Sequence, residues 1–390
     1  MITVAQARAA LSDLIAPLPS QEVDLVDAAG RVLAREMQAQ RDQPPFAASS
    51  MDGYAVKSAE VELHAMFKVI GEAAAGHRFE APVGAGQAVR IFTGAPIPEG
   101  TDFVVIQEDV SRTGDLITIT DEPGTKTNIR PAGGDFTVGT VVSAPRILAP
   151  QDIALLASMN IARVPVTRKP VIAILATGDE LVMPGETPGP DQIIASNSFG
   201  LKAMVERLGA TARLLPIARD TLSSLRTAFD LASSADLIVT IGGASVGDHD
   251  LVAQATADLG MERAFYKVAM RPGKPLMAGR LNGAAMVGLP GNPVSAMVCG
   301  HIFLAPMIRT MLGLGTELPS LRAATLDSPL AQNGPREHYM RAVVADGKVT
   351  AFDNQDSSLL TILSQANALL VREPNDPTLA AGASVNYLPL

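Results

Sequence analysis

The sequence has no tryptophan, a single cysteine and few aromatic residues, which make up 4% of its 390 residues. One cysteine excludes an internal disulfide framework and a cysteine-rich zinc site. Because Cys299 lies in an apolar helical pattern, we expect a buried structural thiol rather than a nucleophile. The five histidines show no paired spacing of the kind that holds a metal. The core must therefore be packed mainly with aliphatic side chains. Any binding or catalysis must use carboxylates, cations and backbone groups.

The sequence also lacks an excess of positive charge. Its 31 Lys and Arg against 40 Asp and Glu leave a formal net charge of −9, which, with so few aromatic rings for base stacking, argues against nucleic-acid binding. No apolar run reaches the roughly 18 residues of a membrane span, and the first residues lack the basic and apolar regions of a signal peptide. We therefore expect a cytoplasmic protein that binds neither nucleic acid nor membrane.

The hydrophobic pattern predicts a multidomain α/β protein. A short amphipathic helix opens the chain, and Gly/Pro turns then separate short β-rich runs. Farther on, buried strands alternate with helices, which predicts a central doubly wound, mostly parallel sheet. The β-rich end is expected to form a small β-barrel or sandwich. The predicted domains are an N-terminal helical and strand region (1–45 plus 146–168), an inserted β-rich lobe (46–145), an α/β domain (169–318) and a C-terminal β domain (319–390).

Individual elements are predicted within the α/β domain. The continuous apolar run at 171–175 indicates a strand buried on both faces, and 237–241 is expected to form a further strand. Asn282-Gly283 is typical of a hairpin turn, and the apolar run from about Pro293 to Met311 predicts one closing helix.

A block without acids stands out in this acidic chain. Residues 263–316 contain no Asp or Glu and include two Pro/Gly turns, at 271–275 and 289–295. Such clearing of carboxylates indicates a local anion site, to which the free N–H groups of the following helix could add. Ordinary strand–turn–helix connections with chance charge explain the pattern about as well. The cations of the block are Arg263, Lys267, Arg271, Lys274, Arg280 and Arg309.

Polar loops are expected to meet at one edge of the sheet, because ligands of open α/β sheets bind outside the carboxyl ends of the strands. The loops are 177–180, 219–220, 242–250, 271–275 and 290–295. Carboxylates at Glu180, Asp220 and Asp250 are hard oxygen ligands suited to Mg²⁺. Taken singly, each acid is more often a helix cap or turn residue.

The same loops suggest how a phosphate would be held. The glycine-rich turn at 242–247 follows a strand, so its backbone N–H groups could meet a phosphate. Two prolines stiffen the loop around Lys274, and Arg271 offers a bidentate fork to a tetrahedral oxyanion. No Ser-His-Asp order and no cysteine nucleophile stands out. The pattern therefore favours metal-assisted transfer at a phosphate without a covalent enzyme intermediate.

Taken in order, the motifs resemble the MoeA family, the molybdopterin molybdenumtransferases, whose architecture the E domain of gephyrin shares. The likeness covers nearly the whole chain. It runs through Pro-Pro-Phe and Ser-Met-Asp-Gly-Tyr-Ala (44–55), Phe-Thr-Gly-Ala-Pro-Ile-Pro-Glu-Gly (92–100), Gly-Asp-Phe (134–136), Leu-Leu-Ala-Ser (155–158), Ala-Thr-Gly-Asp-Glu-Leu-Val (176–182), Ser-Asn-Ser (196–198), Gly-Gly-Ala-Ser-Val-Gly-Asp-His-Asp (242–250), Arg-Pro-Gly-Lys-Pro (271–275) and Gly-Leu-Pro-Gly-Asn-Pro-Val-Ser-Ala (288–296).

The resemblance implies an elongated homodimer with four domains per chain. It assigns dimer contacts to the N-terminal region and molybdopterin binding to the α/β domain. It also implies a reaction in which molybdate enters the dithiolene of adenylylated molybdopterin, Mg²⁺ assists and AMP is released. The partner chain's second domain would complete the cleft, and a pterin adenylyltransferase would act upstream.

Site residues follow from the same resemblance and from the loops above. The catalytic candidates are Asp52, Thr93, Asp135, Glu180, Asp220 and Lys274, and the metal candidates are Glu180, Asp220 and Asp250. The substrate-binding candidates are Gly242, Gly243, Ser245, Asp250, Arg271, Pro275, Ser295, Arg341 and Ser357. The sequence departs from the family pattern where Arg271 replaces a frequent Lys, at Gly134, and in the surroundings of Arg341 and Ser357.

Two other functions remain open at this point. The pterin adenylyltransferase that makes the intermediate shares the α/β domain, but it usually stands as one small domain, and a requirement for ATP would identify it. A non-catalytic scaffold is the other alternative, since the gephyrin E domain also anchors receptors. Pterin binding without turnover would identify a scaffold.

Overall fold

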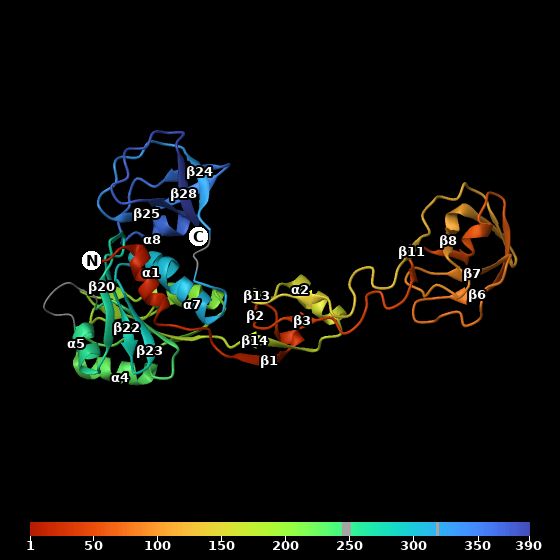
Figure 1. The fold of residues 1–390 in the computed structure, drawn as a ribbon. Coiled ribbons are helices and arrows are strands. Elements are labelled where there is room, and N and C mark those ends of the chain that lie inside the picture. Colours follow the sequence, from red (N-terminus) through yellow and green to blue (C-terminus); the bar gives the residue numbers. More distant parts are fainter. Residues whose placement is uncertain (244–250, 317–319) are drawn as a thin grey trace. The chain divides into compact units, whose positions relative to one another are not determined.

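The structure, a computed structural model, describes residues 1–243, 251–316 and 320–390 (Figure 1). The chain divides into two compact units. Unit 1 contains Met1–Gln21, Gly30–Ala34 and Val166–Leu390, and unit 2 contains Glu22–Ala29 and Arg35–Pro165. The chain passes between the units four times: within β1 (Ser20–Asp24), before and after the short segment Gly30–Ala34, and within β14 (Arg163–Thr167). The boundaries of the four expected domains stay a prediction.

Unit 2 is built around a six-stranded sheet in the order β8-β5-β7-β6-β10-β9. β6 and β7 pair in parallel, and the other neighbours are antiparallel. Tyr54 and Val56 pack into a cluster on one face, whereas Ala55 packs on the other, so the strand is covered on both sides. The strands are β5 Gly53–Val56, β6 Met66–Ala73, β7 Gln87–Ile91, β8 Phe103–Ile106, β9 Val110–Thr113 and β10 Leu116–Ile119.

The rest of unit 2 consists of short elements and one helix. The helix α2 (Pro150–Ser158) begins with proline at its first position, which suits the fixed φ of that residue. Asp152 accepts a hydrogen bond from Ala149 N–H (2.9 Å) and pairs with Arg146, so the helix start is capped. The other elements are η1 Leu25–Asp27, β3 Met37–Gln38, β4 Ala48–Ser49, η2 Ser58–Glu60, η3 Gln107–Asp109, β11 Ile129–Arg130, β12 Val141–Val142 and β13 Arg146–Ile147.

Unit 1 contains the expected doubly wound sheet, in the order β18-β15-β19-β23-β22-β20. The first four strands are parallel neighbours, and β22 and β20 add in antiparallel fashion. A two-residue turn with positive φ at Asn282 and Gly283 joins β22 to β23, which confirms the predicted hairpin. The strands are β15 Val171–Ala176, β18 Thr211–Leu214, β19 Leu237–Ile241, β20 Glu262–Lys267, β22 Pro275–Leu281 and β23 Ala284–Leu289.

Helices cover both faces of this sheet (Figure 1). In β15, Ile172 and Ile174 pack against one helical layer, and Ala173 and Leu175 pack against the other. Because both faces of β15 are covered, all of its positions are apolar. The first layer holds α1 Val4–Ser12, α3 Asn197–Arg207, α6 Pro293–Cys299 and α7 Ala305–Met311, and the second holds α4 Leu222–Ala232 and α5 Leu251–Asp258.

The predicted helix from Pro293 to Met311 is interrupted. Between α6 and α7 the chain forms a five-residue π-helical segment, Gly300–Leu304. Pro306, the second residue of α7, has no N–H to donate to the preceding turn, so a wider turn is accommodated here. This 19-residue stretch (mean hydropathy 1.4) is long and apolar enough to cross a membrane, contrary to the expectation from the sequence. However, 78% of its apolar window is buried inside the unit, as in a core helix.

The C-terminal residues of unit 1 form a closed barrel, which decides between the two predicted β architectures. The strands follow the order β25-β26-β24-β28-β27, and β27 returns to pair with β25. β21 (Met270–Arg271) extends this sheet from the α/β domain by pairing in parallel with β25. The barrel elements are β24 Arg322–Leu326, β25 Glu337–Ala345, β26 Lys348–Ala351, α8 Leu360–Gln365, β27 Ala368–Arg372 and β28 Ser384–Pro389; unit 1 also contains β2 Val32–Leu33, β16 Leu181–Val182 and β17 Ile193–Ile194.

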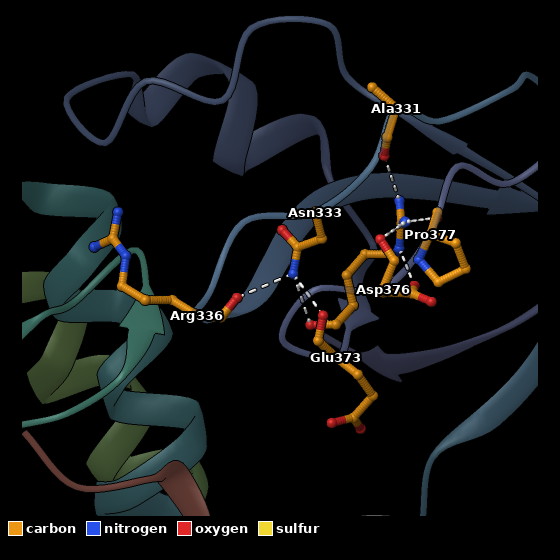
Figure 2. A network of polar contacts seen from close by, with 7 residues as sticks. Ala331, Asn333, Arg336, Glu373, Asp376 and Pro377 are labelled. Atoms are coloured by element: carbon orange, nitrogen blue, oxygen red, sulfur yellow. Dashed lines mark hydrogen bonds and ion pairs between the residues drawn. The ribbon is translucent and has the colours of Figure 1, made fainter.

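A polar network ties one end of the barrel together (Figure 2). The side chain of Arg372, which is 2% exposed, pairs with the Asp376 carboxylate and donates to the carbonyl oxygens of Ala331 and Pro377 at 3.3 and 2.7 Å. The Asn333 amide donates to the Glu373 carbonyl oxygen at 2.7 Å. Because the donors of Arg372 and Asn333 bond to groups of the fold itself, the network stabilises the turns rather than offering charge to a ligand.

Candidate active site

A cavity of about 820 Å³ opens at the edge of the α/β sheet where the parallel strands end. This volume lies in the range of small-molecule sites. The loops after β15, β19 and β23 line it, together with the start of α3 and with β17. The sequence had predicted that these loops meet at one edge, and the cavity confirms it.

The loop 271–275 reaches the same edge for a different reason. It does not follow a parallel strand of the α/β sheet, as the sequence analysis assumed, but precedes β22, which runs antiparallel to β23. The amino end of an antiparallel strand lies beside the carboxyl end of its neighbour. Pro275 therefore lines the cavity.

Glycines allow the backbone of these loops to approach closely. Gly242 and Gly243 both have positive φ, at 88° and 64°. A Cβ at Gly242 would lie 2.9 Å from the Thr177 carbonyl oxygen, and one at Gly243 would lie 2.2 Å from Val252 Cγ2. Because side chains rarely adopt this conformation and have no room here, the strand end after β19 requires glycine.

Two carboxylates line the cavity, those of Glu180 and Asp220. Glu180 and Asp220 are exposed, and in the described part of the chain their carboxylates show no hydrogen bond or ion pair. Asp179 orders the loops instead: its side chain accepts from the Asp220 N–H at 3.2 Å, and its carbonyl accepts from Arg219 at 3.0 Å. The acids at 180 and 220 are therefore free to bind a ligand.

These carboxylates fit a magnesium ion in type and number. Mg²⁺ usually takes one or two protein carboxylates and completes its shell with water and substrate phosphate. The described residues contain no group of three or more potential metal ligands. The third acid predicted as a ligand, Asp250, lies outside the described residues, as does Ser245.

Four of the six cations of the acid-free block are engaged with the fold. Arg280 donates to the Leu14 carbonyl at 2.9 Å and Arg309 to the Leu314 carbonyl at 3.4 Å. The other two engaged cations, Arg263 and Lys267, lie over the Tyr266 ring.

Arg271 and Lys274 are exposed, and within the described residues their side chains show no hydrogen bond or ion pair. Between them, Gly273 (φ 104°) packs against α6, and a Cβ there would lie 2.4 Å from the sulfur of Cys299. Cys299 is buried, as predicted, and burial raises the pKa of its thiol.

The barrel contacts the cavity rim through the loop after β26. Arg341, which is 2% exposed, donates through its guanidinium to the Asp356 carbonyl at 2.7 Å. In the same loop, the Ser357 hydroxyl accepts from the Asn292 amide at 2.9 Å, and the Ser357 carbonyl accepts from the Val294 N–H at 3.0 Å. The start of α6 and this loop are thereby joined.

The predicted residues divide into distinct locations. Glu180, Asp220, Gly242, Gly243 and Pro275 line the cavity. The others of unit 1 that the structure describes, namely Lys274, Arg271, Ser295, Arg341 and Ser357, lie outside its lining; Ser295 and Arg341 are buried. The roles of all of them stay predictions.

In unit 2 the structure brings Asp52 and Thr93 together. The Asp52 carboxylate accepts from both the N–H and the hydroxyl of Thr93 at 2.7 Å, and these bonds lower the pKa of Asp52. Gly53 is required beside it, because a Cβ there would lie 2.0 Å from the Val105 carbonyl oxygen. The third predicted residue of this unit, Asp135, is exposed, and its backbone N–H donates to Gln43.

Several polar lining residues were missed as site candidates. Five of the six lie in segments through which the resemblance runs, but none was assigned a role there. The Asn197 side chain donates to the Gly291 carbonyl at 2.6 Å, and both residues line the cavity. The sequence signal that could have identified such lining residues was the presence of polar residues at the starts of helices. The missed residues are Thr177, Ser196, Asn197, Ser198, Asn292 and Ser358.

Comparisons with known families cover most of the chain. The MoeA N-terminal region (domain I and II) matches residues 2–160, the probable molybdopterin binding domain matches 173–310, and the MoeA C-terminal region (domain IV) matches 323–390.

Individual relatives agree over the full length. The chain is 35% identical to the molybdopterin molybdenumtransferase of Haemophilus influenzae, covering 100% of this chain and 98% of the relative. It is 35% identical to the enzyme of the same name from Nostoc, covering 97% and 91%. Among solved structures, the molybdopterin biosynthesis moeA protein from Pyrococcus horikosii superimposes with a TM-score of 0.86 at 27% identity, covering 100% and 99%. The chain therefore belongs to the MoeA family of molybdopterin molybdenumtransferases.

Proposed function

We propose that this enzyme inserts molybdate into adenylylated molybdopterin and releases AMP, in a reaction that depends on Mg²⁺. Its place among the transferases of molybdenum cofactor biosynthesis follows from the family. One observation carries the finer proposal. A cavity of about 820 Å³ is lined by Glu180 and Asp220, whose carboxylates show no partner among the described residues, and it lies beside a loop whose cations Arg271 and Lys274 show none there either.

The chain's own residues have separable tasks in this proposal. Lys274 and Arg271 attract the molybdate dianion, and Arg271 adds a planar fork that matches an oxyanion. Glu180 and Asp220 hold Mg²⁺, which would offset the negative charge on the phosphoanhydride as it breaks. The glycines at 242 and 243 let the backbone approach the substrate closely.

The deciding experiment measures AMP release by the purified protein from adenylylated molybdopterin. We expect release that requires both molybdate and Mg²⁺. Lys274→Ala should reduce molybdate-dependent release by about 100-fold or more, since a transition-state charge contact is worth a few kcal/mol. Lys169→Ala removes an exposed lysine of the same unit as a matched control. Unchanged molybdate-dependent release by Lys274→Ala would exclude the assigned role.

The proposal includes a homodimer, as the resemblance implies, in the cytoplasm and downstream of a pterin adenylyltransferase. If Asp52 of one chain serves Lys274 of its partner, inactive Asp52→Asn and Lys274→Ala proteins should complement each other on mixing. Random pairing leaves both residues intact at about a quarter of the sites, so about a quarter of the activity should return. No recovery after verified subunit exchange would exclude a site shared in this way.

A further inference from the structure

Gln355, a half-buried residue of the loop between β26 and α8, uses its whole side-chain amide inside the fold. Its oxygen accepts from the backbone N–H and the Nε of Arg341 at 3.0 and 3.2 Å. Its NH₂ donates to the carbonyl oxygens of Arg341 and Phe352 at 3.0 and 2.8 Å. An amide supplies two donors and an acceptor in one plane, and no other side chain of this length does so.

These bonds fix the guanidinium that orders the rest of the loop. With its Nε held by Gln355, Arg341 donates through its two terminal nitrogens to the carbonyl oxygens of Asp356 and Asn354, at 2.7 and 3.4 Å. The Asp356 carboxylate then accepts from the N–H and hydroxyl of Ser358 at 2.8 and 2.6 Å. The loop is therefore built outward from the amide of Gln355.

The far end of the same loop reaches the cavity. Ser358 lines it, and Ser357 bonds both the Asn292 side chain and the Val294 N–H at the start of α6. Asn292 is itself a lining residue. Two polar groups of the cavity thus depend on a loop whose anchor is in the barrel.

We propose that Gln355 is a positioning residue for the substrate cavity. It does not line the cavity, and it acts through Arg341 and Ser357 on the placement of Asn292 and Ser358. Only the expected effect of Gln355 on turnover rests on the proposed function. Its effect on the start of α6 can be measured without substrate.

The test substitutes Gln355→Glu, which keeps the acceptor but turns a carboxylate oxygen toward two carbonyl oxygens. Gln365→Glu is the matched control, since Gln365 is an exposed residue of α8 and receives the same change. We expect the KM for adenylylated molybdopterin to rise about tenfold in Gln355→Glu, with kcat changed much less, because misplaced binding groups weaken substrate positioning. Gln365→Glu should match the wild type.

Hydrogen–deuterium exchange supplies the second readout, in the full chain without substrate. Gln355→Glu should speed exchange in segment 290–299 as well as in 352–359, because the Val294 N–H loses its acceptor. Faster exchange confined to 352–359, or a KM equal to that of the control, would overturn the proposal. Gln355→Asn, with a shorter amide, should show the same changes to a smaller extent and serves if the charged variant does not fold. If the wild type releases no AMP, the proposed function fails, while the exchange experiment still decides the positioning role.

Discussion

The barrel and the sheet edge of unit 1 both contain charged side chains, but they use them in opposite ways. In the barrel, Arg341 and Arg372 are each 2% exposed and donate to several carbonyl oxygens. The network that includes Ala331, Asp376 and Pro377 is shown in Figure 2. At the sheet edge, Glu180 and Asp220 are exposed, and their carboxylates show no partner in the described part of the chain. A buried charge must be satisfied within the fold, whereas an exposed one can remain free for a ligand.

The comparison predicts that the two kinds of charge fail differently when they are removed. Loss of a barrel charge should lower the free energy of unfolding, and loss of a sheet-edge charge should lower ligand binding or turnover alone. The following predictions test this division from the largest expected effect to the smallest.

The largest effect is expected from Arg372→Met. This substitution leaves the Asp376 carboxylate and the carbonyls of Ala331 and Pro377 without their donor. The free energy of unfolding should fall by about 3–5 kcal/mol, as for other broken buried ion pairs. Urea unfolding measures it, with Arg322→Met on the exposed face of β24 as a control expected within about 0.5 kcal/mol. A loss below about 1 kcal/mol for Arg372→Met would remove the distinction between the two regions.

The second effect concerns the free carboxylates. The double substitution Glu180→Gln, Asp220→Asn should leave stability nearly unchanged but reduce Mg²⁺-dependent AMP release by about 100-fold or more. Mg²⁺ affinity, measured by calorimetry in the presence of substrate, should fall in parallel. Asp230→Asn with Glu262→Gln removes the same two charges from exposed positions of this unit and serves as the control. If the double variant still bound Mg²⁺ like the wild type, the assigned ligands would be wrong.

A pH effect is expected from His338, which the barrel buries near four arginines. Burial first, and then the charges of Arg271, Arg336, Arg372 and Arg341, lower the pKa of His338 to about 4. The unfolded chain, with an ordinary pKa near 6.5, then binds more protons than the folded one. Stability should therefore be full above about pH 6.5 and fall as the pH drops toward about 4, by up to about 3 kcal/mol.

The measurement compares urea unfolding of the wild type and His338→Gln at several pH values. The substituted protein should lose less stability between pH 7 and pH 4. Burial raises the pKa of Glu337, which acts in the opposite direction, but this residue is present in both proteins and does not affect the sign of the difference. Identical slopes would contradict the expected contribution of His338.

The smallest effect is expected at an exposed but hydrogen-bonded charge in unit 2. Thr93→Val removes one of the two donors that lower the pKa of Asp52. The pKa of Asp52 should therefore rise toward its ordinary value, as an NMR titration would show. Asp102, whose pKa is lowered in the same way by Ser58, is an internal control that should not move. A shift of both carboxyls, or of neither, would contradict the local cause.

Local patterns predicted many of the elements that position the site. The strand expected at 237–241 matches β19 residue for residue, and Asn282-Gly283 forms the expected turn. Burial favours apolar residues and positive φ favours Asn and Gly, so both features can be recognised from residue type. The π-helical segment before Pro306 was not predicted, since one proline fits a kink, a break or a wider turn equally well.

The sequence by itself determined the acid-free block, the glycine turns and the family, which are properties of residue order. The tertiary structure decided which charges are free. Arg280 and Arg309 belong to the same block as Lys274, but their guanidinium groups reach carbonyl oxygens that the fold brings near them, and Lys274 shows no such partner among the described residues. It also placed Gln355, which is distant from Asn292 in the sequence, where its hydrogen bonds influence the position of Asn292. Hydrogen bonds form between groups that are close in space. The number of residues between two groups indicates their distance only when both lie in the same helix or strand.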